Sequence, residues 1–227
     1  MKRGILITAA IVCCLAVAVP ALATSTRAKI EESIDVMNRL ASIPERTIPP
    51  ALLAKAEGVA IIPGVIRAGF ILGGRYGQGV LLLRENGRWS DPVFITLTGG
   101  SIGWQIGVES VDVILVFKTK RSVEGILRGK FTLGADAGVA AGPVGREASA
   151  ATDVQLKAEV YSYSRSRGLF AGLAIQGSAL QVDDEADAGF YGKEVTPHEI
   201  ARGEVPRVPE SAARLKKLIA DYEKKNN

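Results

Sequence analysis

The sequence predicts an α+β domain built on a strongly curved, mostly antiparallel β-sheet, a half barrel or a closed barrel, with helices at both chain ends. Two observations support this fold class. Short apolar or alternating runs between Val59 and Val182 are separated by glycines, a pattern typical of strands that turn and bend. Before residue 41 and after residue 209, apolar residues instead recur at helical spacing.

The predicted N-terminal helix starts at Thr26, where Ser25 or Thr26 can cap it. Its apolar face consists of Ile30, Ile34, Met37 and Leu40. Pro50 suits the first turn of a short second helix over 51–57, which Gly58 ends. Both elements precede the first strand.

Strand-like runs fill the middle of the chain. They cover 59–63, 65–72, 79–85, 92–97, 102–108 and 111–118, and then, after a short helix at 122–128, they cover 130–134, 156–163, 169–175 and 179–182. Asn86-Gly87 predicts a two-residue hairpin turn, because a type I′ turn needs positive φ at both central positions. The small-residue stretch 135–151 fits either an ordered loop or closely packed strands.

The C-terminal part contains an acidic cluster and two helices. Asp183, Asp184, Glu185 and Asp187 lack the spacing of a calcium-binding loop, so we expect a solvated turn there. Thr196-Pro197 predicts a helix start, and the residues from Pro209 to Lys225 predict an amphipathic final helix.

The first residues have the pattern of an export signal. Lys2 and Arg3 precede an apolar run over 4–19, and Ala21-Leu22-Ala23 has the small-x-small pattern of a cleavage site. The run is about 16 residues, shorter than a membrane span requires, so we favour cleavage over a transmembrane anchor. We therefore expect a signal peptide at 1–23 and a periplasmic or secreted chain, peripheral to a membrane.

The remaining residues, 24–227, suit a single domain with a core at about 27–200 and a C-terminal helix at 209–225. Cys13 and Cys14 both lie in the apolar run and lack the preceding small residue of a lipoprotein signal, so neither a disulfide nor lipidation is expected. Removing Lys2 and Arg3 from 28 basic residues leaves 26 against 24 acidic ones, a net charge of +2. Such a small charge does not predict binding to nucleic acid.

Catalysis has weak support. Gly99-Gly100-Ser101-Ile102-Gly103 has the spelling of a nucleophile elbow, but Ser101 lies between two strand-like runs instead of between a strand and a helix. His198 is the single histidine, placed in the first turn of a predicted helix, where a surface or capping role is the simpler interpretation. We expect no enzyme, no metal and no cofactor; a serine hydrolase using Ser101 is the remote alternative.

Basic residues near aromatic ones form the strongest candidate binding feature. They are Arg67, Arg75 beside Tyr76, Lys118, Lys120, Arg121, Arg165 and Arg167. If some of them converge, they form a face for phosphate headgroups, with aromatic rings at the membrane interface. The alternative is that each is a solvated residue that protects a sheet edge.

Seven ordered motifs resemble the SYLF domain, a lipid-binding family. They are Gly58–Pro63, Gly73–Gly79, Trp89–Pro92, Thr132–Asp136, Ala141–Gly145, Tyr163–Gly172 and Phe190–Gly192, within a match from about Arg27 to Ile200. The resemblance implies binding of anionic lipids, with the N-terminal amphipathic helix at the membrane. Ile30, Ile34, Met37 and Leu40 then become candidates for lipid contact, although their periodicity fits packing on the sheet equally well.

The predicted export limits what the resemblance implies. Family members take part in actin organisation, but a bacterial envelope offers no actin, so we expect no actin partner and we expect phosphatidylglycerol or cardiolipin as the anionic ligand. The sequence thus predicts non-catalytic binding of an anionic phospholipid surface in a cell envelope. The alternative is a protein-interaction or scaffold domain with an envelope protein partner.

Overall fold

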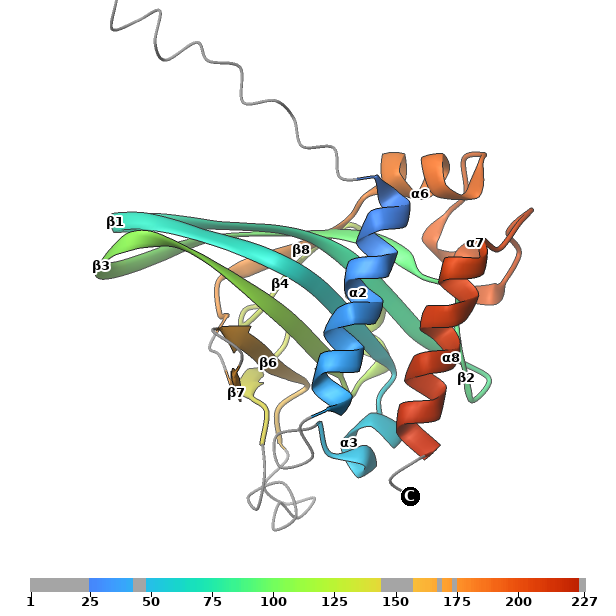
Figure 1. Ribbon diagram of the computed structural model, residues 1–227, viewed down its shortest axis with the longest axis horizontal. Coiled ribbons are helices and arrows are strands. Elements are labelled where there is room, and N and C mark those ends of the chain that lie inside the picture. Colours follow the sequence, from blue (N-terminus) through green and yellow to red (C-terminus); the bar gives the residue numbers. More distant parts are fainter. Residues whose placement is uncertain (1–24, 43–47, 144–156, 167–168, 173–174, 225–227) are drawn as a thin grey trace, which may run out of the picture.

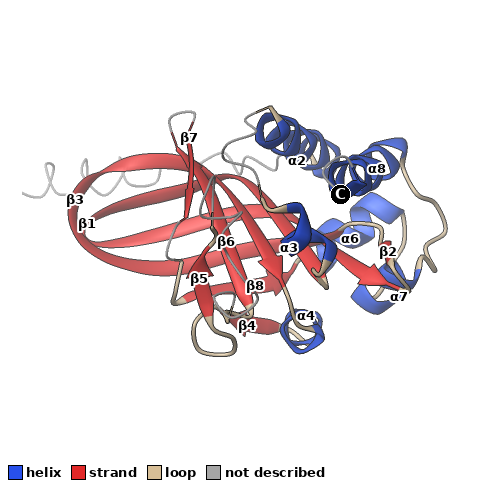
Figure 2. Cartoon of the chain, turned by 90° about the horizontal axis from the view of Figure 1, so that it is seen from below, coloured by secondary structure: helices blue, strands red, loops and turns tan. Residues whose placement is uncertain are grey.

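The computed structural model describes residues 25–42, 48–143, 157–166, 169–172 and 175–224. Side chains are described for these residues except 69–72, 101–107, 166 and 169–172. A curled sheet forms the centre, and helices cover it from several sides (Figures 1 and 2). The α+β class with terminal helices and a strongly curved, half-barrel sheet is confirmed.

Six helices lie in the described part of the chain. They are α2 (Thr26–Ala41), α3 (Pro50–Ala54), α4 (Lys120–Leu127), α6 (Asp184–Tyr191), α7 (Pro197–Arg202) and α8 (Glu210–Lys224). All the helices expected from the sequence are present, and α6 is additional. Within the described residues, no helix combines the length and hydropathy needed to cross a membrane.

Two of the strands are far longer than the sequence runs suggested. The strands are β1 (Gly58–Glu85), β2 (Arg88–Trp89), β3 (Val93–Phe117), β4 (Lys130–Thr132), β5 (Val139–Ala141), β6 (Val160–Ser166), β7 (Leu169–Gly172) and β8 (Ser178–Val182). The glycines that separate the apolar runs do not end strands. They let β1 and β3 bend, with shifts of register between Ile62 and Val65 and between Gly69 and Ile71.

The sheet has the order β2-β1-β3-β6-β5. β8 pairs with another part of β3, β4 pairs with β8, and β7 pairs with β6. Every pair is antiparallel except β5 and β6. The predicted hairpin between β1 and β2 is confirmed, since Asn86 and Gly87 have φ values of 50° and 75°.

The long β1/β3 ribbon curls until the two ends of β1 meet. Arg84 N donates a hydrogen bond of 2.8 Å to Glu57 O. At the crossing, a Cβ built on Gly79 would lie 2.2 Å from the carbonyl oxygen of Ile61. Only glycine permits this approach, so Gly79 sets how tightly the ribbon can curl.

Each face of the curled ribbon has its own apolar core. The concave face gathers Ile62, Val65, Leu81, Ile95, Leu97 and Leu180, with residues of α4 and α7. The convex face gathers Ile61, Val80, Leu82 and Ile114, with residues of α2, α3 and α8. Strand residues alternate between the two cores, because successive side chains point to opposite faces.

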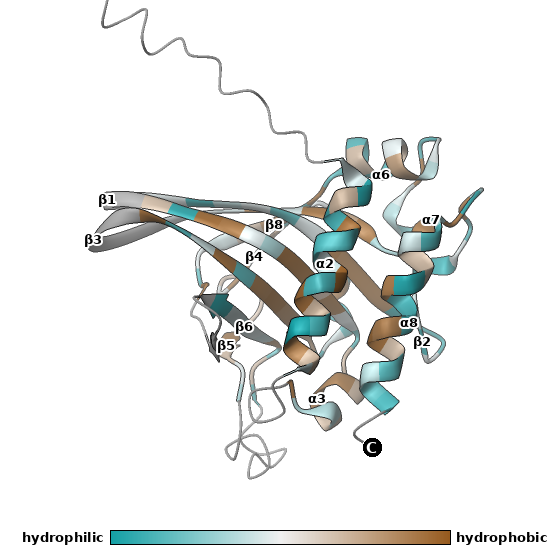
Figure 3. Cartoon of the chain, in the orientation of Figure 1, coloured by the Kyte–Doolittle hydropathy of each residue, from teal (hydrophilic) through white to brown (hydrophobic). Residues whose placement is uncertain are grey.

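Helix α2 and helix α8 pack side by side over the convex face, with their apolar stripes toward the sheet (Figures 2 and 3). Ile30, Met37 and Leu40 of α2 are fully buried. Arg214 of α8 forms an ion pair with Glu31 of α2 at the solvent side. The amphipathic pattern of each helix therefore serves packing in this structure.

The acidic cluster is not a solvated turn, and that expectation is wrong. Asp183 caps α6 by accepting a hydrogen bond of 3.0 Å from Ala186 N, and Asp184 and Glu185 lie in the first helical turn. Carboxylates stabilise this end of a helix because its free N–H groups carry partial positive charge. Asp187 is buried and accepts a hydrogen bond of 2.9 Å from Phe94 N.

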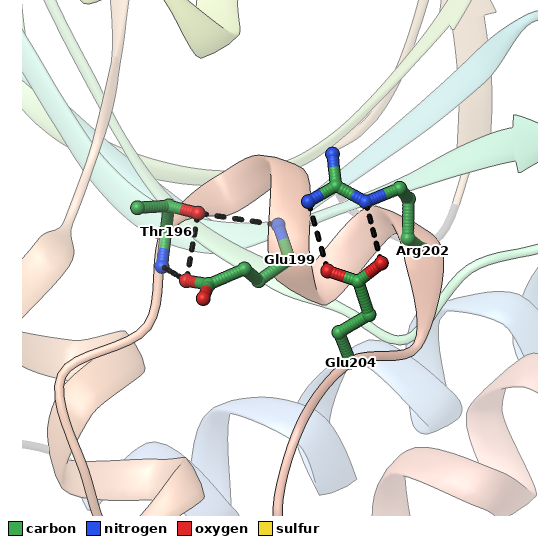
Figure 4. A network of polar contacts seen from close by, with 4 residues as sticks. All are labelled: Thr196, Glu199, Arg202 and Glu204. Carbon is green, nitrogen blue, oxygen red and sulfur yellow. Dashed lines mark hydrogen bonds and ion pairs between the residues drawn. The ribbon is translucent and has the colours of Figure 1, made fainter.

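Helix α7 begins as Thr196-Pro197 predicts. Thr196 N donates to Glu199 Oε2 at 2.7 Å, and Glu199 N donates to Thr196 Oγ1 at 3.2 Å, which completes a capping box (Figure 4). Just beyond the helix, Arg202 donates two hydrogen bonds of 2.8 Å to the carboxylate of Glu204. These contacts fix the turn that leads to α8.

Candidate lipid-binding surface

The candidate surface is a two-stranded ribbon that projects from the sheet. β8 pairs with β3 up to Gly99, and β6 pairs with β3 only from Asp112 onward. Between these points β3 pairs with β1 alone, and the ribbon extends away from the helices at the left of Figure 1 and of Figure 2. We call β1 residues 66–76 and β3 residues 98–110 the projecting ribbon.

Exposed apolar side chains gather on this ribbon. Among the described side chains, the large apolar ones that are exposed are Ile66 (50%), Tyr76 (50%), Val108 (78%) and Val208 (39%). The first three lie on the projecting ribbon, and Val208 lies in the loop before α8. Folding normally buries such side chains, so three of them on one projecting ribbon mark this ribbon as an interaction surface.

Two of the predicted basic residues lie on the same ribbon. Arg67 faces Glu109 across the strand pair, with Nη1 3.8 Å from Oε2 of the carboxylate. Arg75 faces Gly99, whose absent side chain leaves room for the Arg75 chain to cross β3. Arg67 follows Val65 by two positions and Arg75 precedes Gly77 by two, so both arginines belong to the concave face.

The surroundings of Arg75 disfavour its positive charge. Burial lowers the pKa of Arg75 from its usual value, and the positive charge of Arg67 lowers that pKa further. The two arginines lie on opposite arms of β1, and the strand alternation places both on the concave side of the ribbon.

The other predicted basic residues do not join this pair. Lys118, Lys120 and Arg121 follow the far end of β3 or begin α4. Glu109 and Phe117 are separated by about 25 Å of strand, so this group lies well away from Arg67. Lys118 Nζ lies 6.0 Å from the ring centroid of Tyr161, and Lys120 and Arg121 are exposed.

Arg165, a further predicted basic residue, forms ionic contacts away from the ribbon. Arg165 Nη1 lies 3.8 Å from Asp112 Oδ2, and Arg39 of α2 lies 3.9 Å from the same oxygen. Asp112 of β3 thus contacts β6 through Arg165 and α2 through Arg39. Arg167 lies outside the described residues.

The predicted lipid-binding face of α2 is buried in this structure. Ile30, Met37 and Leu40 pack against β1 and α8, and Ile34 is half-buried beside them. The structure therefore shows the packing alternative. Contact of this face with lipid would require α2 to leave the sheet and expose a core of the domain.

Ser101 does not lie in a nucleophile elbow. It pairs with Gly73 in the middle of β3, and β3 continues to Phe117 without a helix. His198 lies half-buried in the first turn of α7, where its capping-box neighbours account for the local structure. The geometry offers the hydrolase alternative no strand-turn-helix context.

Comparison with known proteins identifies the family. A family model described as Ysc84, Las17-binding protein actin regulator, matches residues 98–222, which is more than half of the chain. The chain belongs to the Ysc84 family. The match confirms the SYLF resemblance that the ordered motifs indicated.

Several curated relatives match over most of this chain. SH3 domain-containing YSC84-like protein 1 of Xenopus laevis is 38% identical over 185 residues, 80% of this chain and 55% of the relative. Protein YSC84 of Saccharomyces cerevisiae is 38% identical over 179 residues, 77% of this chain and 38% of the relative. LAS seventeen-binding protein 3 of Saccharomyces cerevisiae is 38% identical over 169 residues, 73% of this chain and 37% of the relative. The chain thus spans about half or less of these relatives, and none of their names is that of an enzyme.

The Ysc84 family description corrects the expected partners. We expected no actin partner because the predicted export would separate the chain from the cytoskeleton. That expectation is wrong: the family is described as an actin regulator that binds Las17, and one relative carries the name LAS seventeen-binding protein 3. The prediction failed because it gave more weight to the predicted export signal than to the family resemblance.

Sequence reasoning did not find Ile66 and Val108. Both lie in strand-like runs whose pattern does not show which residues neighbouring strands and helices leave uncovered. The Gly73–Gly79 motif around Arg75 and Tyr76 was the one available signal.

Proposed function

We propose that this Ysc84-family domain is a non-catalytic binding module that docks on anionic phospholipid through the projecting ribbon. Ile66, Tyr76 and Val108, on one face of the ribbon, enter the interfacial region, while Arg67 and Arg75, on the opposite face, supply positive charge for phosphate groups beside it. The observation that carries the proposal is the concentration of exposed apolar side chains on the same short ribbon as two arginines.

The sequence of the ribbon supports this mode of binding. Residues 69–72 and 101–107, which complete its outer part, contain no charged residue. The outer part of the ribbon is uncharged, and arginines lie on either side of it. This order suits a membrane interface, where apolar groups lie deeper and cations stay at the level of the phosphates. A projecting two-stranded element can reach a surface without any change in the packed cores.

The cellular setting is a further part of the proposal. If residues 1–23 direct export, as the sequence predicts, phosphatidylglycerol and cardiolipin are the anionic lipids within reach. Binding through the ribbon does not depend on export. It requires a membrane with a negatively charged surface and an apolar interior, and no particular headgroup.

The test is co-sedimentation of the purified chain with phosphatidylcholine vesicles and with vesicles containing phosphatidylglycerol, at low and high salt. We expect binding to the anionic vesicles alone, weakening steeply as salt rises. Replacing Ile66, Tyr76 and Val108 together by Ser should weaken binding about tenfold or more, since each substitution removes apolar burial. Val208→Ser is the matched control, because Val208 is an exposed apolar residue away from the ribbon.

Equal binding by the triple variant and the unchanged chain would contradict the ribbon mode. Absence of binding to any anionic vesicle would contradict the lipid function itself. Weaker binding by the triple variant supports the ribbon mode only if the variant keeps its unfolding midpoint, which substitutions at exposed positions permit.

A second candidate is binding to an actin-regulatory protein, favoured by the family description. In this case the domain would bind purified Las17 in solution without lipid. A direct titration of the chain with Las17 distinguishes the two functions, because vesicles and salt should then have little influence on the affinity.

A further inference from the structure

The concave side of the projecting ribbon holds polar groups whose hydrogen-bonding capacity is unused. Arg75 Nε and Nη1 are buried, and neither has a hydrogen-bond partner among the described residues. Ser178 Oγ is also buried, again without a hydrogen-bond partner in the part of the chain that the structure describes. Unpaired buried groups of this kind cost free energy, so a fold retains them where something else satisfies them.

The side chains of Arg75 and Ser178 both approach one glycine. Arg75 of β1, Gly99 of β3 and Ser178 of β8 face one another across three neighbouring strands. A Cβ built on Gly99 would lie 2.8 Å from Ser178 Oγ and 3.2 Å from Arg75 Cγ. Gly99 therefore lets the arginine chain and the hydroxyl approach each other above the backbone of β3.

The charges around this point favour an anion. Arg67 and Arg75 share the concave face of the ribbon, and Arg67 Nη1 lies 3.8 Å from the Glu109 carboxylate oxygen Oε2. These three ionised side chains sum to one positive charge. A guanidinium offers only donors, and a hydroxyl can add another, so the fitting ligand is an oxyanion with several acceptor oxygens.

We infer that Arg75 and Ser178, supported by Arg67, form an oxyanion-binding site for a phosphate group on the concave side of the ribbon. The inference rests on the proposed function for the carrier of that phosphate, a lipid headgroup at the docked surface. The same chemistry would accept free phosphate, and the experiment separates the two sources.

The first arm of the experiment titrates inorganic phosphate into the ¹⁵N-labelled full chain at constant ionic strength. We expect saturable shifts of the Arg75 Nε–H resonance and of the Gly99 and Ser178 amides. Ser178→Ala should weaken phosphate binding about tenfold, which corresponds to one hydrogen bond to a charged group. Arg75→Gln should abolish saturation, and Arg207→Gln, a change at an exposed loop arginine, should leave it unchanged.

The second arm measures binding of the same variants to phosphatidylglycerol vesicles. Loss of vesicle binding in Arg75→Gln supports a headgroup site. Phosphate saturation without vesicle binding by the unchanged chain supports the site with free phosphate as ligand, and it removes the lipid function.

Two results would overturn the inference. One is the absence of saturable phosphate shifts at Arg75, Gly99 and Ser178. The other is equal phosphate affinity of Arg75→Gln and the unchanged chain. If vesicles still bind in either case, the proposed function survives and the site does not. Ser178→Ala keeps the test valid even if Arg75→Gln does not fold, because it removes a single oxygen.

Discussion

The guanidinium of Arg84 lies over the indole ring of Trp89, with Cζ 4.2 Å from the ring centroid. Both side chains donate to the same oxygen, Glu223 Oε2, at 3.2 Å from Arg84 Nη2 and 3.1 Å from Trp89 Nε1. Arg84 also donates to the carbonyl oxygens of Leu53 and Ala56. The end of β1, the β1–β2 hairpin, α3 and α8 are thus held together by one polar cluster.

Glu223→Ala should lower the free energy of unfolding by about 1–3 kcal/mol, because it leaves the indole N–H and one guanidinium donor without their acceptor. Urea-induced unfolding measures the change. Glu194→Ala, at an exposed position in the loop before α7, is the control and should change stability by less than about 0.5 kcal/mol. Equal effects of the two substitutions would remove the structural role assigned to the cluster.

Asp187 should make the domain less stable as pH rises. Burial raises the pKa of its carboxyl to about 8, the hydrogen bond from Phe94 N lowers it, and the nearby charges of Asp184 and Asp183 raise it again. The folded state therefore holds a proton that the unfolded state releases near the ordinary value of 3.8. This contribution is complete below about pH 4 and is lost as pH rises to about 8.

The measurement for Asp187 is the urea midpoint between pH 5 and pH 9. Asp187→Asn keeps an oxygen for Phe94 N and cannot ionise, so it should flatten the decline and be more stable than the unchanged chain at pH 9. Asp221→Asn, on the exposed side of α8, should keep the original slope. An unchanged slope in Asp187→Asn would show that this carboxyl does not control the decline.

Gly79→Ala should be one of the most damaging single substitutions in the chain. Its Cβ would meet the Ile61 carbonyl oxygen at 2.2 Å and Ile62 Cα at 2.7 Å, and backbone cannot move aside as a side-chain end can. We expect a loss of about 3 kcal/mol or failure to fold. Gly100→Ala has no atom within 4 Å of its Cβ and should be tolerated, with urea unfolding as the measurement. A stable Gly79→Ala variant would mean that the ribbon curls less tightly.

The sequence predicted those elements whose signals are local. The spacing in α2 and α8, the Asn86-Gly87 turn and the Thr196-Pro197 helix start depend on neighbouring residues, and all appear as expected. The glycines between Gly64 and Gly79 were harder to interpret. Local pattern shows that glycine permits a bend, but only the pairing of β1 with β3 shows that the strand continues through it.

The candidate site was predictable in its residue types and not in its assembly. Arg67 and Arg75 were singled out because of charge, yet their shared position on the concave side depends on the curl of β1, which is a tertiary property. Arg165 was singled out for the same reason and instead pairs with Asp112. Asp187 was wrongly predicted to be solvated, because the acidic cluster has the composition of an exposed turn. Its burial depends on the hydrogen bond from Phe94 N, a residue far away in the sequence.

The most direct test of the central claim is the environment of the ribbon on a membrane. Val108→Cys and Val208→Cys, each in a chain with Cys13→Ser and Cys14→Ser, would carry an environment-sensitive fluorophore. On phosphatidylglycerol vesicles, our account predicts a blue shift of the label at position 108 and none at position 208. A bound chain in which the label at 108 stays in water, or in which only the label at 208 shifts, would contradict docking through the projecting ribbon.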